Sequence, residues 1–344
     1  MGECGCVFGM RRCVAMEPRA RVTSTCARAK GGGGITRRTA GWSALLAWTS
    51  SERKGSAQPT GGPYYQDGRA VGRVDEDARR EYGKRIKPVD RMNMRKDIVL
   101  LVQEKVMEHV EPDARHPQLL RLAAADATTY RFGAPKNIGG PAGGANGSVA
   151  VFEEEKNLLV EAGLGDVLQQ LVKAKQEVDR TWKERAQQNQ ALQTPTDISW
   201  ADMIALAAQT GVMEAWNKTN QGDEKPMEEP FTTRQGRIDR PGVEPYQRMP
   251  QWALSPTPAN ATAAREWLHG NGFSDAQAAA LIAELCGGLD AGLDTLRGDP
   301  VLAKNATAFQ KNQVAYRQAF QEGFVRMTSL GSSFDPYAYL YDLK

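Results

Sequence analysis

The sequence predicts a mainly α-helical protein, and three observations support this fold class. From about residue 92, apolar residues recur at the three- and four-residue spacing of amphipathic helices. Serines stand at the expected helix starts, and glycines follow the last periodic residues. No segment shows the apolar and polar alternation of a half-buried strand. We therefore expect one helical domain of roughly 260 residues behind a distinct N-terminal leader.

The first three helices can be assigned in chain order. The first, MNMRKDIVLLVQEKVMEHV, ends before Pro112, and its apolar face is formed by Ile98, Leu101, Val102 and either Met94 or Val106. The second is expected to begin at Pro117 and to continue through the alanines of RLAAADATTY. After a loop rich in glycine and proline, the glutamates at 153–155 open a third, and a long amphipathic helix follows over about 165–187.

The later helices have clear start and stop signals. Ser199 is expected to cap SWADMIALAAQTGVMEAW, with Asp202 in the capping-box position. Ser274 is expected to cap SDAQAAALIAELC, which ends before a glycine. The final helix stops at Gly331, and its aromatic stripe is typical of a core, with Tyr316, Phe320, Phe324 and Met327 on one face.

Composition limits the classes of function. The chain has 44 basic and 41 acidic residues, and most of the positive excess lies in the leader, so no nucleic-acid partner is indicated. No apolar run reaches about 18 residues, so no transmembrane segment is expected. Four cysteines precede residue 27, namely Cys4, Cys6, Cys13 and Cys26, and the body has only Cys286. Removal of the leader would therefore leave no intrachain disulfide.

The leader, residues 1–57, resembles two stacked targeting signals. Basic residues lie among Ser, Thr, Ala and Gly with few acids, as in an organelle transit peptide. The twin arginine Arg37 and Arg38 precedes a short apolar stretch and the small residues GSA at 55–57, as in an export signal. Such a bipartite peptide would deliver the protein to the chloroplast and then to the thylakoid lumen. The alternative is a disordered tail with an accidental arginine pair.

Six segments, in order, resemble the motifs of class I plant-type heme peroxidases, and are most similar to those of ascorbate peroxidases. They are LLRLAAADATTY, GGANGSVAVFEEEKNLLVEAGL, DISWADMIALAAQTGVMEA, GRIDRP, GFSDAQAAALIAEL and YRQAFQEGFVRMTSLG. The resemblance covers residues 92–331 and leaves an N-terminal extension at 58–91. It implies an all-helical fold in which distal and proximal halves surround a heme cleft.

The distal motif of the family has lost its catalytic residues here. The family has Arg-Leu-Ala-Trp-His-Asp, in which the histidine moves a proton of bound peroxide and the arginine stabilises developing charge. By this resemblance Arg121 matches the distal arginine, whereas Ala124 replaces the tryptophan and Ala125 replaces the histidine. Asn146 matches the asparagine that orients the missing histidine. Arg121 and Asn146 are therefore expected to be vestigial, and helix–helix hydrogen bonds are the favoured role of Arg121.

The proximal motif is altered as well. Counting from the cap in GFSDAQAAALIAEL, the resemblance places Leu285 at the position of the iron-ligating histidine, which makes heme ligation doubtful. The positions that match the two ascorbate-contacting basic residues fall at Asp113 and near Asp294. The chain has three histidines, His109, His116 and His269, and none matches a family position. Neither a cofactor nor a metal ion is therefore expected.

Three hypotheses follow for the function. The first is a pseudoperoxidase, similar to a thylakoid-lumen branch that lacks heme ligands and is associated with photosystem II membranes; this implies a binding or assembly role. The second is an active heme peroxidase that reduces hydrogen peroxide in oxidative stress and uses a substitute ligand such as Cys286. A small buried thiol is the commoner interpretation of that cysteine. The third is another enzyme, for which no catalytic constellation is visible.

The C-terminal tail, residues 332–344, has two interpretations. Its segment SSFDPYAYLYDLK is rich in aromatic residues and too short to fold alone. It could form a docking strip for a partner, or it could fold back on the surface of its own domain. The acidic stretch at 220–230 is expected to be a solvated insertion.

Overall fold

The structure is a computed structural model, and it describes residues 64–66, 69–71, 85–130, 143–192, 194–219, 231, 233–239 and 249–341. The chain divides into two units, Met1–Ala57 and Gln58–Lys344, and every described residue belongs to the second. The leader, with Arg37 and Arg38, and the acidic stretch at 220–230 lie outside the described residues. In the described part, no helix has the length and apolar character needed to cross a bilayer.

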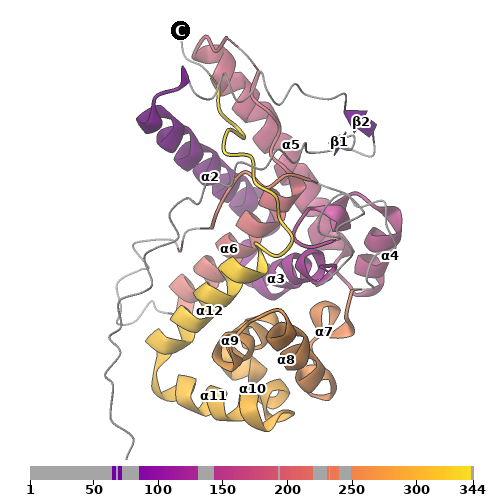
Figure 1. Ribbon diagram of the computed structural model, residues 1–344. Helices are drawn as coiled ribbons and strands as arrows, with labels where there is room; N and C mark the ends of the chain where they lie inside the picture. Colours follow the sequence, from indigo (N-terminus) through magenta and orange to yellow (C-terminus); the bar gives the residue numbers. More distant parts are fainter. Residues whose placement is uncertain are drawn as a thin grey trace, which may run out of the picture. The chain divides into compact units, whose positions relative to one another are not determined.

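Helices dominate the described residues, as the sequence predicts (Figure 1). The first group is α2 (Pro88–Val110), α3 (Pro112–Thr128), η2 (Ser148–Ala150), α4 (Glu153–Glu161), α5 (Gly165–Gln188) and α6 (Trp200–Thr219). The second group is α7 (Gln251–Leu254), η3 (Pro258–Asn260), α8 (Ala261–Gly270), α9 (Asp275–Leu285), α10 (Leu289–Arg297), α11 (Pro300–Lys311) and α12 (Gln313–Met327).

One short hairpin departs from the expectation of helices alone. Strands β1 (Tyr64–Gln66) and β2 (Arg69–Val71) pair antiparallel, with Tyr64 opposite Val71. Three residues are too few to show a convincing alternation, which is why the strand pattern was not visible. The Asp-Gly pair between the strands is a typical hairpin-turn sequence and is the signal that could have indicated it.

The predicted face of α2 is confirmed, because Met94, Ile98, Leu101, Val102 and Val106 are all buried. The helix begins at Pro88, earlier than the expected residue 92, since proline is well suited to the first helical position.

The predicted start of α3 at Pro117 is wrong. The helix begins at Pro112, and Pro117 lies inside it. A proline there leaves the carbonyl of Asp113 without its usual backbone donor. Nδ1 of His116 lies 3.2 Å from that carbonyl oxygen and can supply the missing hydrogen bond. The side chain of His116 thus helps the helix to continue past the proline.

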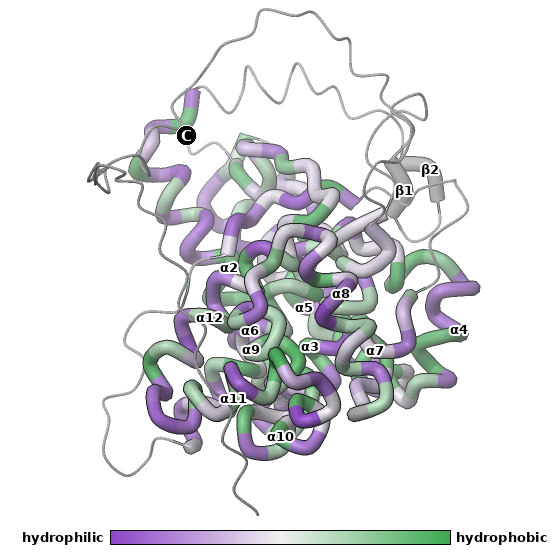
Figure 2. The backbone as a smooth tube through the Cα atoms, turned by 60° about the horizontal axis from the view of Figure 1, so that its bottom comes forward, coloured by the Kyte–Doolittle hydropathy of each residue, from purple (hydrophilic) through white to green (hydrophobic). Residues whose placement is uncertain are grey.

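Two sets of helices meet at α3. In the first set, α3 packs along α6 and α2 packs along α5. In the second, α9 is surrounded by α8, α10, α11 and α12. Helix α3 also contacts α9 directly, so these two helices join the sets. Figure 2 shows hydrophobic residues along α9, close to α3. The predicted aromatic stripe of α12 is confirmed, since Tyr316, Phe320, Phe324 and Met327 are buried.

The predicted caps are confirmed for α9 and only in part for α6. Ser274 and Gln277 form a complete capping box at the start of α9. Ser199 accepts a hydrogen bond from the N–H of Asp202, but the Asp202 carboxylate does not return to the cap. That carboxylate instead pairs with Arg237, 2.7 Å away. The first N–H groups of α6 donate to Asp239, a residue distant in sequence.

The C-terminal tail folds back on its own domain. Tyr339, Leu340 and Tyr341 are buried, the last with its ring edge-on to Trp182 at a centroid distance of 5.4 Å. The Trp182 indole N–H donates to the carbonyl of Tyr339 over 3.0 Å. Three side chains of the proposed docking strip are thus part of the core, whereas Phe334 and Tyr337 remain partly exposed. The folded-back interpretation is confirmed.

Replacing Leu340 with alanine is expected to lower the free energy of unfolding by about 2 kcal/mol, because a buried leucine side chain is lost. Leu340 is 6% exposed, whereas Leu192 is 59% exposed. Leu192→Ala is the matched control and should change stability by less than about 0.5 kcal/mol. Urea unfolding followed by circular dichroism would measure both. Equal losses in the two variants would contradict the burial of the tail.

Candidate functional site

The distal site positions lie on α3 and are apolar and closed to solvent. Ala124 and Ala125 have no exposed surface, and Ala123 is 2% exposed. The hydroxyl of Thr128 donates to the carbonyl of Ala125 over 3.1 Å, and the carboxyl group of the adjacent Asp126 accepts the N–H of Gly147 over 2.9 Å. An alanine methyl group carries neither an acid nor a base. Ala123, Ala124 and Ala125 therefore provide packing surface and no proton-transfer group.

Arg121, which matches the distal arginine, binds backbone carbonyls. Its Nε donates to the carbonyl of Pro117 over 3.3 Å, and its Nη1 donates to the carbonyl of Leu254 over 3.2 Å. The second bond links α3 to the end of α7. The side chain is half-buried and also interacts electrostatically with Cys286. These contacts give Arg121 the helix-linking role that the sequence favoured.

Asn146 lies in the loop that follows α3 and is also part of the scaffold. It is 4% exposed, and its Oδ1 accepts the N–H of Ser148 over 3.1 Å. The neighbouring N–H of Gly147 donates to Asp126 over 2.9 Å. Gly147 has φ +78°, and a methyl group on it would come within 2.8 Å of the start of α6, so this turn requires glycine. Asp126 thus ties the loop to α3, and Asn146 orders the turn within the loop.

On the proximal side, Leu285 is the last residue of α9 and is 2% exposed. Its neighbour Glu284 is 1% exposed and is the polar centre of this region. Oε1 of Glu284 accepts the indole N–H of Trp216 over 2.8 Å and the hydroxyl of Tyr316 over 2.7 Å. Burial raises the pKa of Glu284. We call Glu284, Trp216, Tyr316 and His116 the Glu284 cluster.

The Glu284 cluster connects α9 to α3 directly. Nε2 of His116 lies 3.7 Å from Oε2 of Glu284. A methyl group built on Gly287 would lie 3.5 Å from Cγ of Pro117. The beginning of α3 is therefore in van der Waals range of the end of α9. Sequence reasoning did not assign a role to His116 or to Glu284, because no local spacing relates residues so far apart.

The two candidate substitute ligands are poorly suited to iron. The thiol of Cys286 is 3.5 Å from the hydroxyl of Thr295, to which it donates, and burial raises its pKa. A raised pKa favours the thiol over the thiolate, which is the form that binds metals. His269 is exposed near the end of α8. Within the described residues, no group of three or more His, Cys, Asp or Glu side chains could hold a metal ion.

The residues at the distal and proximal histidine positions do not fit a heme site. Ala125 and Leu285 have no donor atom, and both are buried in the apolar core. The positions of the family's basic substrate contacts carry acids that are already paired. Asp113 pairs with Lys218, and Asp294 lies 2.8 Å from Arg297. Ala124, Ala125 and Leu285 thus carry no polar side-chain group, whereas Arg121 and Asn146 form hydrogen bonds with the backbone.

Comparisons with known proteins agree with this architecture. A protein-family model described as peroxidase matches residues 101–289, which is more than half of the chain. Among solved structures, the crystal structure of the TL29 protein from Arabidopsis thaliana is similar, with a TM-score of 0.56 and 23% sequence identity. The similarity covers 78% of this chain and 100% of that chain. A search of curated proteins finds no match.

Proposed function

The chain belongs to the peroxidase family, and we propose that it has kept the plant-type heme peroxidase fold and lost peroxidase chemistry. The observation that carries this proposal is the pair of buried apolar residues, Ala125 and Leu285, at the positions of the two histidines. Peroxide cleavage needs a group that takes a proton and returns it to the leaving oxygen, and a methyl group cannot do so. The iron ligand would have to come from elsewhere, and the Cys286 thiol has a raised pKa.

The proposed role is that of a binding or assembly factor in the chloroplast, at photosystem II or the thylakoid membrane. Two features support it: the basic, serine-rich leader with its twin arginine, and the resemblance to the peroxidase-related branch that lacks heme ligands. Arg121 and Asn146 contribute to this role through the scaffold. Arg121 links α3 to the end of α7, and Asn146 orders the loop after α3 by accepting the N–H of Ser148.

A hemin titration tests the loss of heme chemistry. The protein used is the segment 58–344, which contains the whole described core and excludes the four leader cysteines. We expect no saturable Soret band at one hemin per chain, because Leu285, at the position of the iron ligand, offers no donor atom. A sharp one-to-one band that shifts on addition of hydrogen peroxide would contradict the proposal. The heat-unfolded segment is the control for non-specific hemin adsorption.

A further inference from the structure

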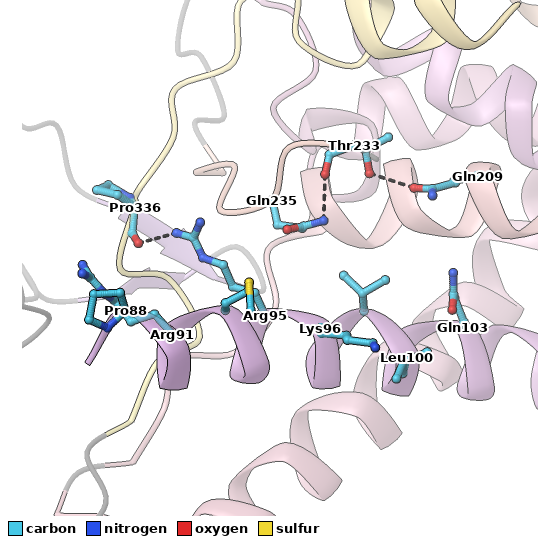
Figure 3. Close-up of a pocket in the computed structure, with 12 residues that line it drawn as sticks. Pro88, Arg91, Arg95, Lys96, Leu100, Gln103, Gln209, Thr233, Gln235 and Pro336 are labelled. Carbon is cyan, nitrogen blue, oxygen red and sulfur yellow. Dashed lines mark hydrogen bonds between the residues drawn. The ribbon is translucent and has the colours of Figure 1, made fainter. Parts of the chain in front are cut away.

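A groove of about 570 Å³ lies along α2, on a part of the molecule that the proposed function does not use (Figure 3). Its floor is one side of α2 from Pro88 to Gln103. Its opposite wall is formed by Gln209 of α6, by Thr233 and Gln235, and by Pro336 of the tail. No lining residue belongs to α3 or α9. The groove is therefore a separate feature from the distal and proximal positions.

The lining is cationic at the end of the groove nearer to Pro336. Arg91, Arg95 and Lys96 all line it, and no lining residue is acidic. Arg95 donates one N–H to the carbonyl of Pro336, which Figure 3 shows across the groove, and keeps further N–H groups for a ligand. Arg91 and Lys96 have no ion-pair partner among the described residues. Unbalanced positive charge at a concave site favours an anion.

The middle of the groove is apolar. Val99 and Leu100 line it, and Met92 adds an apolar side chain at the cationic end; Met92 and Leu100 are 64% and 50% exposed. Large apolar side chains that cluster in a concave and exposed site commonly mark a ligand or interaction site. The aliphatic stem of Lys96 can extend this apolar surface while its ammonium group stays in water. Charge and apolar surface thus lie side by side along one helix.

The opposite wall is neutral and is ordered before any ligand arrives. The hydroxyl of Thr233 donates to Oε1 of Gln209 over 2.8 Å, and Nε2 of Gln235 donates to the carbonyl of Thr233 over 2.7 Å. Nε2 of Gln209 donates to the carbonyl of Phe231 over 2.7 Å. Because these groups are paired with one another, the wall needs little reorganisation on binding, which favours affinity.

From this arrangement we propose that the groove binds a small amphiphilic anion, a single alkyl chain with a carboxylate head. The head is held by Arg91 and Arg95, with the ammonium of Lys96 in reach, through charge-assisted hydrogen bonds. The chain lies on Val99 and Leu100 and points toward Gln103. Arg95 and Gln103 are eight residues apart on one helix, or about 12 Å along its axis, which suits a medium-length alkyl chain. The groove volume lies in the usual range for small-molecule sites.

Isothermal titration of the full chain with laurate, below its micelle concentration, tests the proposal. We expect saturable binding of one laurate per chain. Acetate, which has the same head and no chain, should bind at least about thirtyfold more weakly because it buries little apolar surface. Binding of acetate as tight as that of laurate would overturn the apolar part of the proposal. A lack of saturable laurate binding would overturn it entirely.

A charge-reversal pair locates the binding site. Arg91→Glu combined with Lys96→Glu should weaken laurate binding at least about tenfold, because two cations beside the carboxylate become anions. The matched control is Lys173→Glu with Lys304→Glu, which changes the net charge equally at two exposed residues outside the groove. The control should bind laurate within about twofold of the unmodified chain. Thermal unfolding shows that each variant is folded. If both double variants bound laurate equally weakly, the effect would come from the change in net charge, and the proposed location of the binding site would be overturned.

Discussion

Replacing Asp202 with asparagine is expected to lower the free energy of unfolding by about 3 to 5 kcal/mol. The side chains of Asp202 and Arg237 have no exposed surface, and Oδ1 of the carboxylate lies 2.7 Å from Nη1 of the guanidinium. The other carboxylate oxygen accepts the backbone N–H groups of Gly236 and Arg237 and the hydroxyl of Tyr339. The substitution leaves the Arg237 charge buried without a counter-charge. Such an unpaired buried charge costs more than the pair itself contributes.

Urea unfolding of the full chain measures this loss against two other variants. Tyr339→Phe removes one hydrogen bond to the Asp202 carboxylate and should cost about 1.5 to 3 kcal/mol. Asp294→Asn removes a surface ion pair of 2.8 Å, in which Asp294 and Arg297 have side-chain exposures of 85% and 67%. That control should not change stability measurably. If Asp202→Asn lowered the free energy of unfolding no more than Asp294→Asn does, the contacts of Asp202 would not contribute to holding α6 and the tail together.

The parts of the fold that could be predicted from the sequence are those fixed by local patterns. The apolar face of α2 and the aromatic stripe of α12 follow from helical spacing, and both are buried. The capping box at Ser274 follows from residue types three positions apart. The order of the six motifs indicated the fold, which the match to the peroxidase family and the similar crystal structure support.

The features that could not be predicted depend on partners distant in the sequence. Asp239 caps α6, and the carboxylate expected in that cap, Asp202, pairs with Arg237. The residues that surround each aspartate in the sequence do not show which one caps the helix and which one forms the ion pair. The burial of Tyr339, in the tail, depends on Trp182 of α5 and Asp202 of α6. The sequence pattern of an aromatic tail is therefore the same whether the tail packs into the core of its own domain or stays exposed to bind a partner.

The stability of the chain is expected to fall as the pH rises from about 5 to 9, and Asp126 is the main cause. The pKa of Asp126 is raised to about 8 by burial, with a smaller contribution from the nearby carboxylates of Glu155 and Asp239, and hydrogen bonds from the N–H groups of Gly147 and Val149 oppose the rise. The folded-state pKa lies above the unfolded value of 3.8. The folded chain thus holds a proton that the unfolded chain releases, and stability present below pH 4 is lost as the pH rises toward 8.

Asp126→Asn should remove the largest single part of this slope, because the amide keeps an acceptor for the N–H of Gly147 and does not titrate. Between pH 5 and 9 the stability of the variant relative to the unmodified chain should rise by on the order of 4 kcal/mol. Some slope should remain, since burial raises the pKa of Asp239 to about 7 and also raises the pKa values of Glu155, Asp179 and Glu284. Urea unfolding across this pH range measures the difference, with Asp294→Asn as the exposed control. A constant offset in stability would mean that Asp126 is ionised in the folded chain, because only a group that changes its proton occupancy on unfolding can change the slope.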